Sequence, residues 1–215
     1  MSTGLSISLV AGAYLLGSVS FSVVIVKLIQ GLDVRSVGSG NAGATNVLRA
    51  AGRKAGVAVL ALDIIKGVTA VVVPRILHAP AGVVGSAAVA VVVGHVYPVF
   101  FGFRGGKGVA TSAGALGALA PVAMALGIVL FIVVVAWKRY VSMGSIVTAA
   151  AFPFLAWACH RLGWSDYGGS WLLGSAALIA LLIVVRHAGN LRRLRDGTEP
   201  RLAEPRPQPA GGVRR

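Results

Sequence analysis

Long apolar runs separated by short polar segments are the feature that most constrains the fold of this 215-residue chain. The first run extends from Leu5 to about Ile29 and holds no charged residue before Lys27. About 20 apolar residues suffice for a helix to cross a bilayer, and a helix satisfies its own backbone polar groups there. The run lacks the basic start and cleavage site of a signal peptide, so we expect it to remain as a first membrane span. The sequence therefore predicts an all-α polytopic membrane protein.

Composition supports a membrane protein over a soluble one. Hydrophobic residues make up 56% of the chain, its mean hydropathy is +0.83, and only 12% of its residues are charged. Soluble domains carry about 25% charged residues. Cys159 is the only cysteine in the sequence, which excludes an intrachain disulfide and a cysteine-based metal site.

The formal net charge of +14 comes from 20 Lys and Arg against 6 Asp and Glu. Most of the basic residues lie between apolar runs or in the tail after Arg186. This placement indicates the positive-inside bias and contact with anionic lipid, and it argues against nucleic acid as a partner.

Five more apolar runs follow the first, at about residues 55–77, 83–101, 112–137, 146–159 and 172–185. If the run at 112–137 crossed once, Lys138 and Arg139 would face outside, against the positive-inside bias. A hairpin of two short helices broken around Gly117 and Pro121 keeps both ends inside. We therefore predict seven helical segments, some short or re-entrant, with the N-terminus outside and the C-terminus cytoplasmic. Five segments remain the simpler count.

The predicted topology gives one membrane domain and a tail. Residues 1–199 are expected to form a single transmembrane domain. Residues 200–215, rich in proline, arginine and glycine, are expected to form a disordered basic cytoplasmic tail.

Three polar stretches, at residues 38–49, 94–111 and 186–199, fall on the predicted cytoplasmic side. The first combines glycines with hydroxyl and amide donors and with the forked charge of Arg49. The second places Lys107 among three glycines at the start of a helix, which suits a phosphate, although the sequence is not a Walker motif. Together the stretches are rich in cations and donors and poor in carboxylates. This inventory predicts an anion site.

Several residues near these stretches leave alternatives open. Asp63 and Lys66 share a helical face, either as a structural ion pair near the interface or as support for the polar site. His95 is expected to form a hydrogen bond between helices and not to act as a catalyst. Ser39 is either a nucleophile or a hydrogen-bond donor, and we prefer the donor. His187 and Asn190 share a helical face and are better candidates for substrate contact.

Three ordered motifs resemble the signatures of a known family. The first runs from Gly38 to Arg49. The second comprises Gly94, His95 and Pro98, followed by Gly105 to Thr111. The third comprises Arg186, His187, Asn190, Arg193, Leu194 and Gly197 to Glu199. They resemble the PlsY family of bacterial acyl-phosphate:glycerol-3-phosphate acyltransferases, and the likeness covers nearly all of the chain except the tail.

The resemblance implies transfer of a fatty acyl group from acyl phosphate to the 1-hydroxyl of glycerol 3-phosphate. The products are lysophosphatidic acid and phosphate, in the first acylation of phospholipid synthesis. It also implies a multi-pass protein of the bacterial inner membrane whose active site faces the cytoplasm. No cofactor, metal, acyl-CoA or acyl carrier protein is expected. The expected partners are both substrates, the lipid bilayer and the enzyme that produces acyl phosphate.

We assign candidate site residues on this basis. The expected catalytic residues are Ser39, Arg49, Lys107, His187 and Asn190. The expected substrate-binding residues are Asn41, Thr45, Asn46, Gly105, Gly106, Gly108, Ser142 and Glu199. Because no side chain is a convincing general base, we expect a phosphate oxygen of the donor to take the hydroxyl proton, without a covalent acyl-enzyme.

Two rival functions belong to other classes. One is a transporter or channel for phosphate or an organic phosphate, and the other is a structural or lipid-scaffold protein. A transport path needs polar groups on both sides of the membrane, whereas the polar stretches here gather on one side. That asymmetry favours the enzyme.

Overall fold

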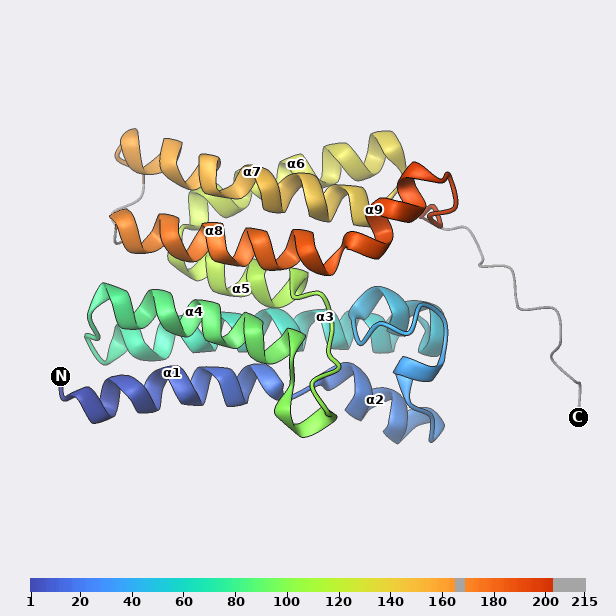
Figure 1. Ribbon diagram of the computed structural model, residues 1–215, viewed down its shortest axis with the longest axis horizontal. Helices are drawn as coiled ribbons and strands as arrows, with labels where there is room; N and C mark the ends of the chain where they lie inside the picture. The colour runs from blue at the N-terminus through green and yellow to red at the C-terminus, as the bar shows by residue number, and fades with distance from the viewer. Residues whose placement is uncertain (165–168, 203–215) are drawn as a thin grey trace, which may run out of the picture.

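Helices account for every element in the part of the chain that the structure, a computed structural model, describes, which is residues 1–164 and 169–202. Figure 1 shows them as a bundle with the N-terminus at one end and α9 at the other. The helices are α1 (Thr3–Ser18), α2 (Phe21–Gln30), η1 (Val34–Ser36), α3 (Ala44–Ile76), α4 (Ala81–Val96), η2 (Val99–Phe101), α5 (Val109–Leu119), α6 (Pro121–Lys138), α7 (Val141–Arg161), α8 (Gly169–Arg186) and α9 (Ala188–Arg195). Residues 203–215 of the predicted tail lie outside the described residues.

The count of seven helical segments is confirmed. Six helical stretches are long and apolar enough to cross a membrane, and α5 is a shorter apolar helix. The predicted hairpin is present, with its break at Ala120 between α5 and α6. Pro121 explains the break, because proline lacks an N–H for the preceding turn and disfavours helical geometry in the residue before it. Which end faces the cytoplasm remains a prediction.

The first span differs from the continuous helix expected between Leu5 and Ile29. It breaks after Ser18, and the freed carbonyls are bound by a side chain from α3. The Lys66 ammonium donates to Gly17 O at 3.1 Å and to Val19 O at 2.9 Å, and lies 2.9 Å from Asp63 Oδ1. An ammonium has three donors, so all three are used. The Asp63–Lys66 pair is therefore buried within the bundle, where it stabilises the break.

The second span begins earlier than residue 55. Helix α3 starts at Ala44, inside the first polar stretch, and is interrupted at Gly52, whose φ of 85° and ψ of 177° are not helical. Such a positive φ is readily adopted only by glycine. The interruption separates a short helix that carries Asn46 and Arg49 from the long membrane-spanning part.

Close helix packing fixes the position of α5. A Cβ at Gly67 of α3 would lie 2.2 Å from Thr111 O, and a Cβ at Gly114 of α5 would lie 2.1 Å from Ile64 O. Only glycine permits this approach of backbone to backbone, as is common between membrane helices. The start of α5 and the loop before it are thereby held against α3.

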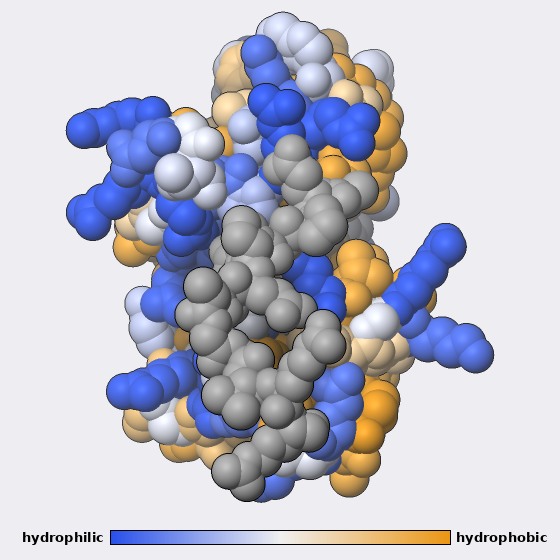
Figure 2. All heavy atoms as spheres, turned by 90° about the vertical axis from the view of Figure 1, so that its right-hand side faces the viewer, coloured by the Kyte–Doolittle hydropathy of each residue, from blue (hydrophilic) through white to orange (hydrophobic). Residues whose placement is uncertain are grey.

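Hydrophilic side chains gather at the end of the bundle where α9 lies. Figure 2 views this end and shows them around its face, flanked by hydrophobic surface. They include exposed cations next to helix ends, namely Arg53, Lys54, Lys138, Arg139, Arg192 and Arg195. The three polar stretches meet at this end.

Candidate functional site

A single cavity of about 1020 Å³ joins the three polar stretches. All thirteen predicted site residues except Gly106 line it. These twelve are Ser39, Asn41, Thr45, Asn46, Arg49, Gly105, Lys107, Gly108, Ser142, His187, Asn190 and Glu199. Segments far apart in the sequence therefore form one site.

The first stretch forms a loop that is braced from inside. The Asn46 side chain is buried; its Oδ1 accepts from the Ser39 N–H at 2.8 Å, and its Nδ2 donates to Val34 O and Val37 O, each at 3.0 Å. Because both ends of this amide are used within the loop, Asn46 orders the loop, and its contact with substrate remains a prediction. Ser39, Thr45 and Arg49 are left exposed at the cavity rim.

The second stretch folds back on the end of α4. The Gly105 N–H donates to Val96 O and the Gly106 N–H donates to His95 O, both at 3.1 Å. A Cβ at Gly106 would lie 2.2 Å from His95 Nε2, so this glycine packs against the histidine. These two amides are engaged within the protein and not aimed at an anion. The features of the stretch that could hold an anion are Lys107 and the N-terminus of α5, whose first-turn N–H groups lack intrahelical partners.

A polar network connects Lys107 to the third stretch. Lys107 Nζ donates to Asn190 Oδ1, Asn190 Nδ2 donates to Glu199 Oε1 at 2.6 Å, and Arg193 Nε donates to Glu199 Oε2 at 2.7 Å. Burial raises the pKa of the Glu199 carboxyl, but donors from Ser142, Asn190 and Arg193 outweigh burial and hold it below its ordinary value. Both carboxylate oxygens thus anchor neighbours. This geometry gives Glu199 a positioning role, and its contact with substrate remains a prediction.

His187 presents one defined nitrogen to the cavity. Its side chain is buried, and Nδ1 lies 2.8 Å from Ile183 O. A carbonyl only accepts, so Nδ1 carries the proton and Nε2 keeps its lone pair. Burial, reinforced by the charge of Lys107, lowers the pKa of His187 to about 4. The imidazole is therefore neutral near pH 7 and can accept a hydrogen bond from a hydroxyl.

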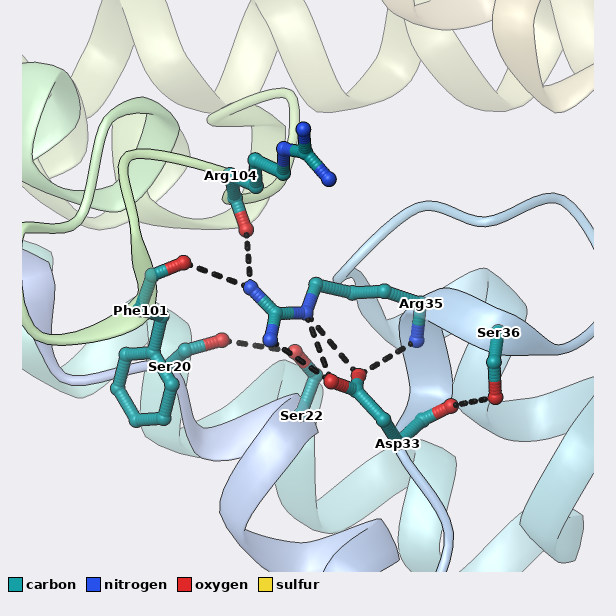
Figure 3. A network of polar contacts seen from close by, with 7 residues as sticks. All are labelled: Ser20, Ser22, Asp33, Arg35, Ser36, Phe101 and Arg104. Atoms are coloured by element: carbon teal, nitrogen blue, oxygen red, sulfur yellow. Dashed lines mark hydrogen bonds and ion pairs between the residues drawn. The ribbon is translucent and has the colours of Figure 1, made fainter.

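The sequence reading missed Arg35, which ties the first stretch to the second (Figure 3). Its Nη1 donates to Phe101 O at 2.7 Å and to Arg104 O at 3.4 Å, while Asp33 holds the other side of the guanidinium at 2.7 Å. Arg35 also lines the cavity. The Asp-x-Arg spacing was visible in the sequence, but the two carbonyl partners more than 60 residues away were not.

Asp63 and His95 also line the cavity, so Asp63 borders the polar site, as one of the two alternatives for the Asp63–Lys66 pair predicts. His95 Nδ1 lies 3.5 Å from Asp63 Oδ1, and both side chains are buried. Lys66 binds the same Asp63 oxygen, and His95 packs against Gly106 of the second stretch. The Asp63 carboxylate therefore connects the helix break in the first span with the loop before α5.

The cavity continues away from the polar residues as an apolar arm between helices. Helices α5, α6 and α7 supply most of its walls. Its residues are Leu60, Ile64, Val109, Leu116, Met124, Gly127, Ile128, Phe131, Val135, Val141, Ala149, Phe152 and Ile183. One cavity therefore offers a cationic mouth and a hydrocarbon compartment. Within residues 1–164 and 169–202, no group of three or more His, Cys, Asp or Glu is placed to hold a metal ion.

Known proteins similar to this chain are acyltransferases. The model of the family described as glycerol-3-phosphate acyltransferase matches residues 7–197. A curated glycerol-3-phosphate acyltransferase from Halalkalibacterium halodurans is 45% identical over 197 residues, which cover 90% of this chain and 94% of the relative.

Two crystal structures of PlsY (YgiH), an integral membrane glycerol 3-phosphate acyltransferase, have the same fold. The glycerol 3-phosphate form has a TM-score of 0.84 and 41% identity, and the match covers 93% of this chain and 96% of that one. The lysophosphatidic acid form has a TM-score of 0.81 and 39% identity, with 92% and 95% covered. This chain, a multi-pass membrane protein, therefore belongs to the glycerol-3-phosphate acyltransferase family.

Proposed function

We propose that this membrane acyltransferase takes its acyl group from an acyl phosphate and transfers it to the 1-hydroxyl of glycerol 3-phosphate. The observation that carries the proposal is the union of a cation-lined mouth and an apolar arm in one cavity. Glycerol 3-phosphate needs only the mouth. An acyl phosphate needs both parts, because its phosphate is anionic and its chain is hydrocarbon.

The polar residues divide between the two phosphates. Lys107, held by Asn190, and Arg49 at the rim bind glycerol 3-phosphate and the charge that develops during transfer. Ser39, Thr45, Ser142 and the start of α5 bind the acyl phosphate, in keeping with the preference of helix N-termini for anions.

The reaction balances without an enzyme nucleophile. The hydroxyl oxygen of glycerol 3-phosphate attacks the acyl carbon, an ester C–O bond forms, and the C–O bond to phosphate breaks. The hydroxyl proton moves to a phosphate oxygen of the donor, which leaves as inorganic phosphate. His187 Nε2 accepts a hydrogen bond from the 2-hydroxyl of glycerol 3-phosphate and so positions the acceptor, while the cations stabilise the departing charge. Catalysis then arises from proximity and electrostatic stabilisation.

The cell inner membrane, with this site facing the cytoplasm, suits the reaction. The cavity mouth lies at the end where the basic side chains gather, and the positive-inside rule assigns such an end to the cytoplasm. The proposed transporter alternative is not favoured, because the cavity changes from polar to apolar along its length and family membership indicates an acyltransferase.

Kinetics of site variants test the proposal. Purified protein is given glycerol 3-phosphate with palmitoyl phosphate, palmitoyl-CoA or palmitoyl acyl carrier protein, and lysophosphatidic acid is measured. We expect product only from palmitoyl phosphate. Lys107→Ala and Arg49→Ala should each reduce kcat/KM at least tenfold, since a hydrogen bond to a charged group contributes about 1.5–3 kcal/mol. As a control, exposed Arg192→Ala should retain activity. Wild-type turnover by both site variants would refute the assignment.

A further inference from the structure

We call the part of the apolar arm that is lined by Gly127 of α6 and Phe152 of α7 its floor. The cavity-lining residues Ser142, Ser145, Ala149 and Phe152 share one face of α7. Phe152 follows Ser142 by ten residues, a rise of about 15 Å along the helix. Phe152 is 2% exposed and belongs to the main hydrophobic core. An arm of this depth suits a fatty chain and is far longer than a short acyl group requires.

Gly127 of α6 faces Phe152 across this floor and lines the cavity. A Cβ at Gly127 would lie 3.4 Å from Thr148 Cγ2 and 3.5 Å from Phe152 Cδ2, both ordinary contact distances. Packing therefore does not require glycine here. Gly144, at the other end of the same helix pair, is different, because its Cβ would lie 2.6 Å from Val135 Cγ2. A methyl group at position 127 would therefore fit against the Thr148 and Phe152 side chains of α7 and would take up space beside the cavity that Gly127 lines.

We propose that Gly127 and Phe152 set the length of the acyl chain that the enzyme accepts. The inference rests on the proposed function, because it assumes that the donor's chain occupies the apolar arm. Gly127 leaves room for the end of the chain, and the Phe152 ring closes the arm. A methyl group at position 127 removes space from the floor, and a smaller residue at position 152 adds space.

The change in chain-length preference is measurable because each buried methylene of the acyl chain contributes to binding. Burying one methylene stabilises a complex by about 0.8 kcal/mol, which corresponds to a factor of about four in kcat/KM. Gly127→Ala should therefore lower kcat/KM for the longest accepted donors about fourfold relative to shorter donors, for each methylene excluded. Phe152→Leu should shift the preference in the opposite direction.

The experiment gives each purified variant an equimolar mixture of saturated acyl phosphates of graded chain length with glycerol 3-phosphate. Mass spectrometry of the lysophosphatidic acids yields ratios of kcat/KM within one reaction, so differences in the amount of active protein cancel. Gly12→Ala is the matched control: it is the same substitution in a membrane helix, in open space with no atom within 4 Å. Its profile should equal that of the wild type.

Opposite shifts from Gly127→Ala and Phe152→Leu would support the inference. Unchanged profiles, or losses equal for every chain length, would overturn it. Failure of the proposed function gives a different result, since the wild-type protein would then consume no acyl phosphate of any length.

Discussion

Replacing Asn190 by aspartate tests the polar network that holds Lys107. Asn190 is buried, its Oδ1 accepts from Lys107, and its Nδ2 donates to Glu199 Oε1 at 2.6 Å. Asn190→Asp keeps the shape but replaces the donor by a second carboxylate oxygen facing Glu199. The lost hydrogen bond to a charged group costs about 1.5–3 kcal/mol. For a chain of this size, that lowers Tm by about 3–12 °C.

The double variant, which combines Asn190→Asp with Glu199→Gln, restores the contact with reversed polarity. The amide introduced at position 199 would donate to the carboxylate introduced at position 190, and the amide oxygen would still accept from Arg193. Thermal unfolding of substrate-free protein in detergent should therefore show recovery of most of the lost Tm. Activity should stay low in both variants, because the new carboxylate neutralises the Lys107 charge that binds phosphate.

Asp196→Asn, an exchange of carboxylate and amide on an exposed residue of the same region, is the control and should leave Tm within about 1 °C of the wild type. A single variant as stable as the wild type would refute the network. So would a double variant no more stable than the single one.

Three further predictions concern the pH dependence of stability, the contacts of Arg35 with the loop carbonyls of Phe101 and Arg104, and the helix break after Ser18. The folded state keeps His187 neutral down to a pH of about 4, whereas the unfolded state protonates it near 6.5, so lowering the pH from 7 to 5 should destabilise substrate-free protein by about 2 kcal/mol through this residue. His187→Gln should remove that part of the pH dependence of unfolding. Arg35→Lys keeps the charge but loses the forked geometry, and kcat/KM for glycerol 3-phosphate should fall about tenfold or more. Lys66→Met leaves Asp63 buried without its ammonium and should cost about 3–5 kcal/mol in stability, seen as a large fall in Tm.

Each of these has an outcome that contradicts it. His187→Gln with an unchanged dependence of Tm on pH would mean that another group is responsible. Arg35→Lys with wild-type kinetics would show that catalysis does not depend on the hydrogen bonds from Arg35 to the loop carbonyls. The control is Arg53→Lys, the same substitution at an exposed position. A Lys66→Met protein as stable as the wild type would mean that the break in the first span is held by other contacts.

Local patterns predicted the number of helical segments and the hairpin. Apolar runs and Pro121 are visible in the sequence, because helix formation in a membrane depends on residues near one another. The break after Ser18 was not predictable in this way. It depends on Lys66, which lies on another helix and binds the freed carbonyls.

In the candidate site, too, local motifs were predictable and contacts between distant segments were not. Motifs identified which residues gather, and all but Gly106 of the predicted set line one cavity. Their individual tasks depend on neighbours from other segments. The polar atoms of Asn46 and Glu199, for example, are bound by other groups of the protein, and these partners cannot be read from the motifs. The apolar arm was also hidden, because lipid-facing and cavity-facing residues of a membrane helix are equally apolar.

The most direct measurement is the stoichiometry of the reaction. Purified protein in detergent is incubated with palmitoyl phosphate and glycerol 3-phosphate, and inorganic phosphate and lysophosphatidic acid are quantified in parallel. We expect both products in equal amounts, with phosphate release dependent on glycerol 3-phosphate. A folded protein that forms no lysophosphatidic acid, or that releases phosphate without the acceptor at the same rate, would contradict the central claim.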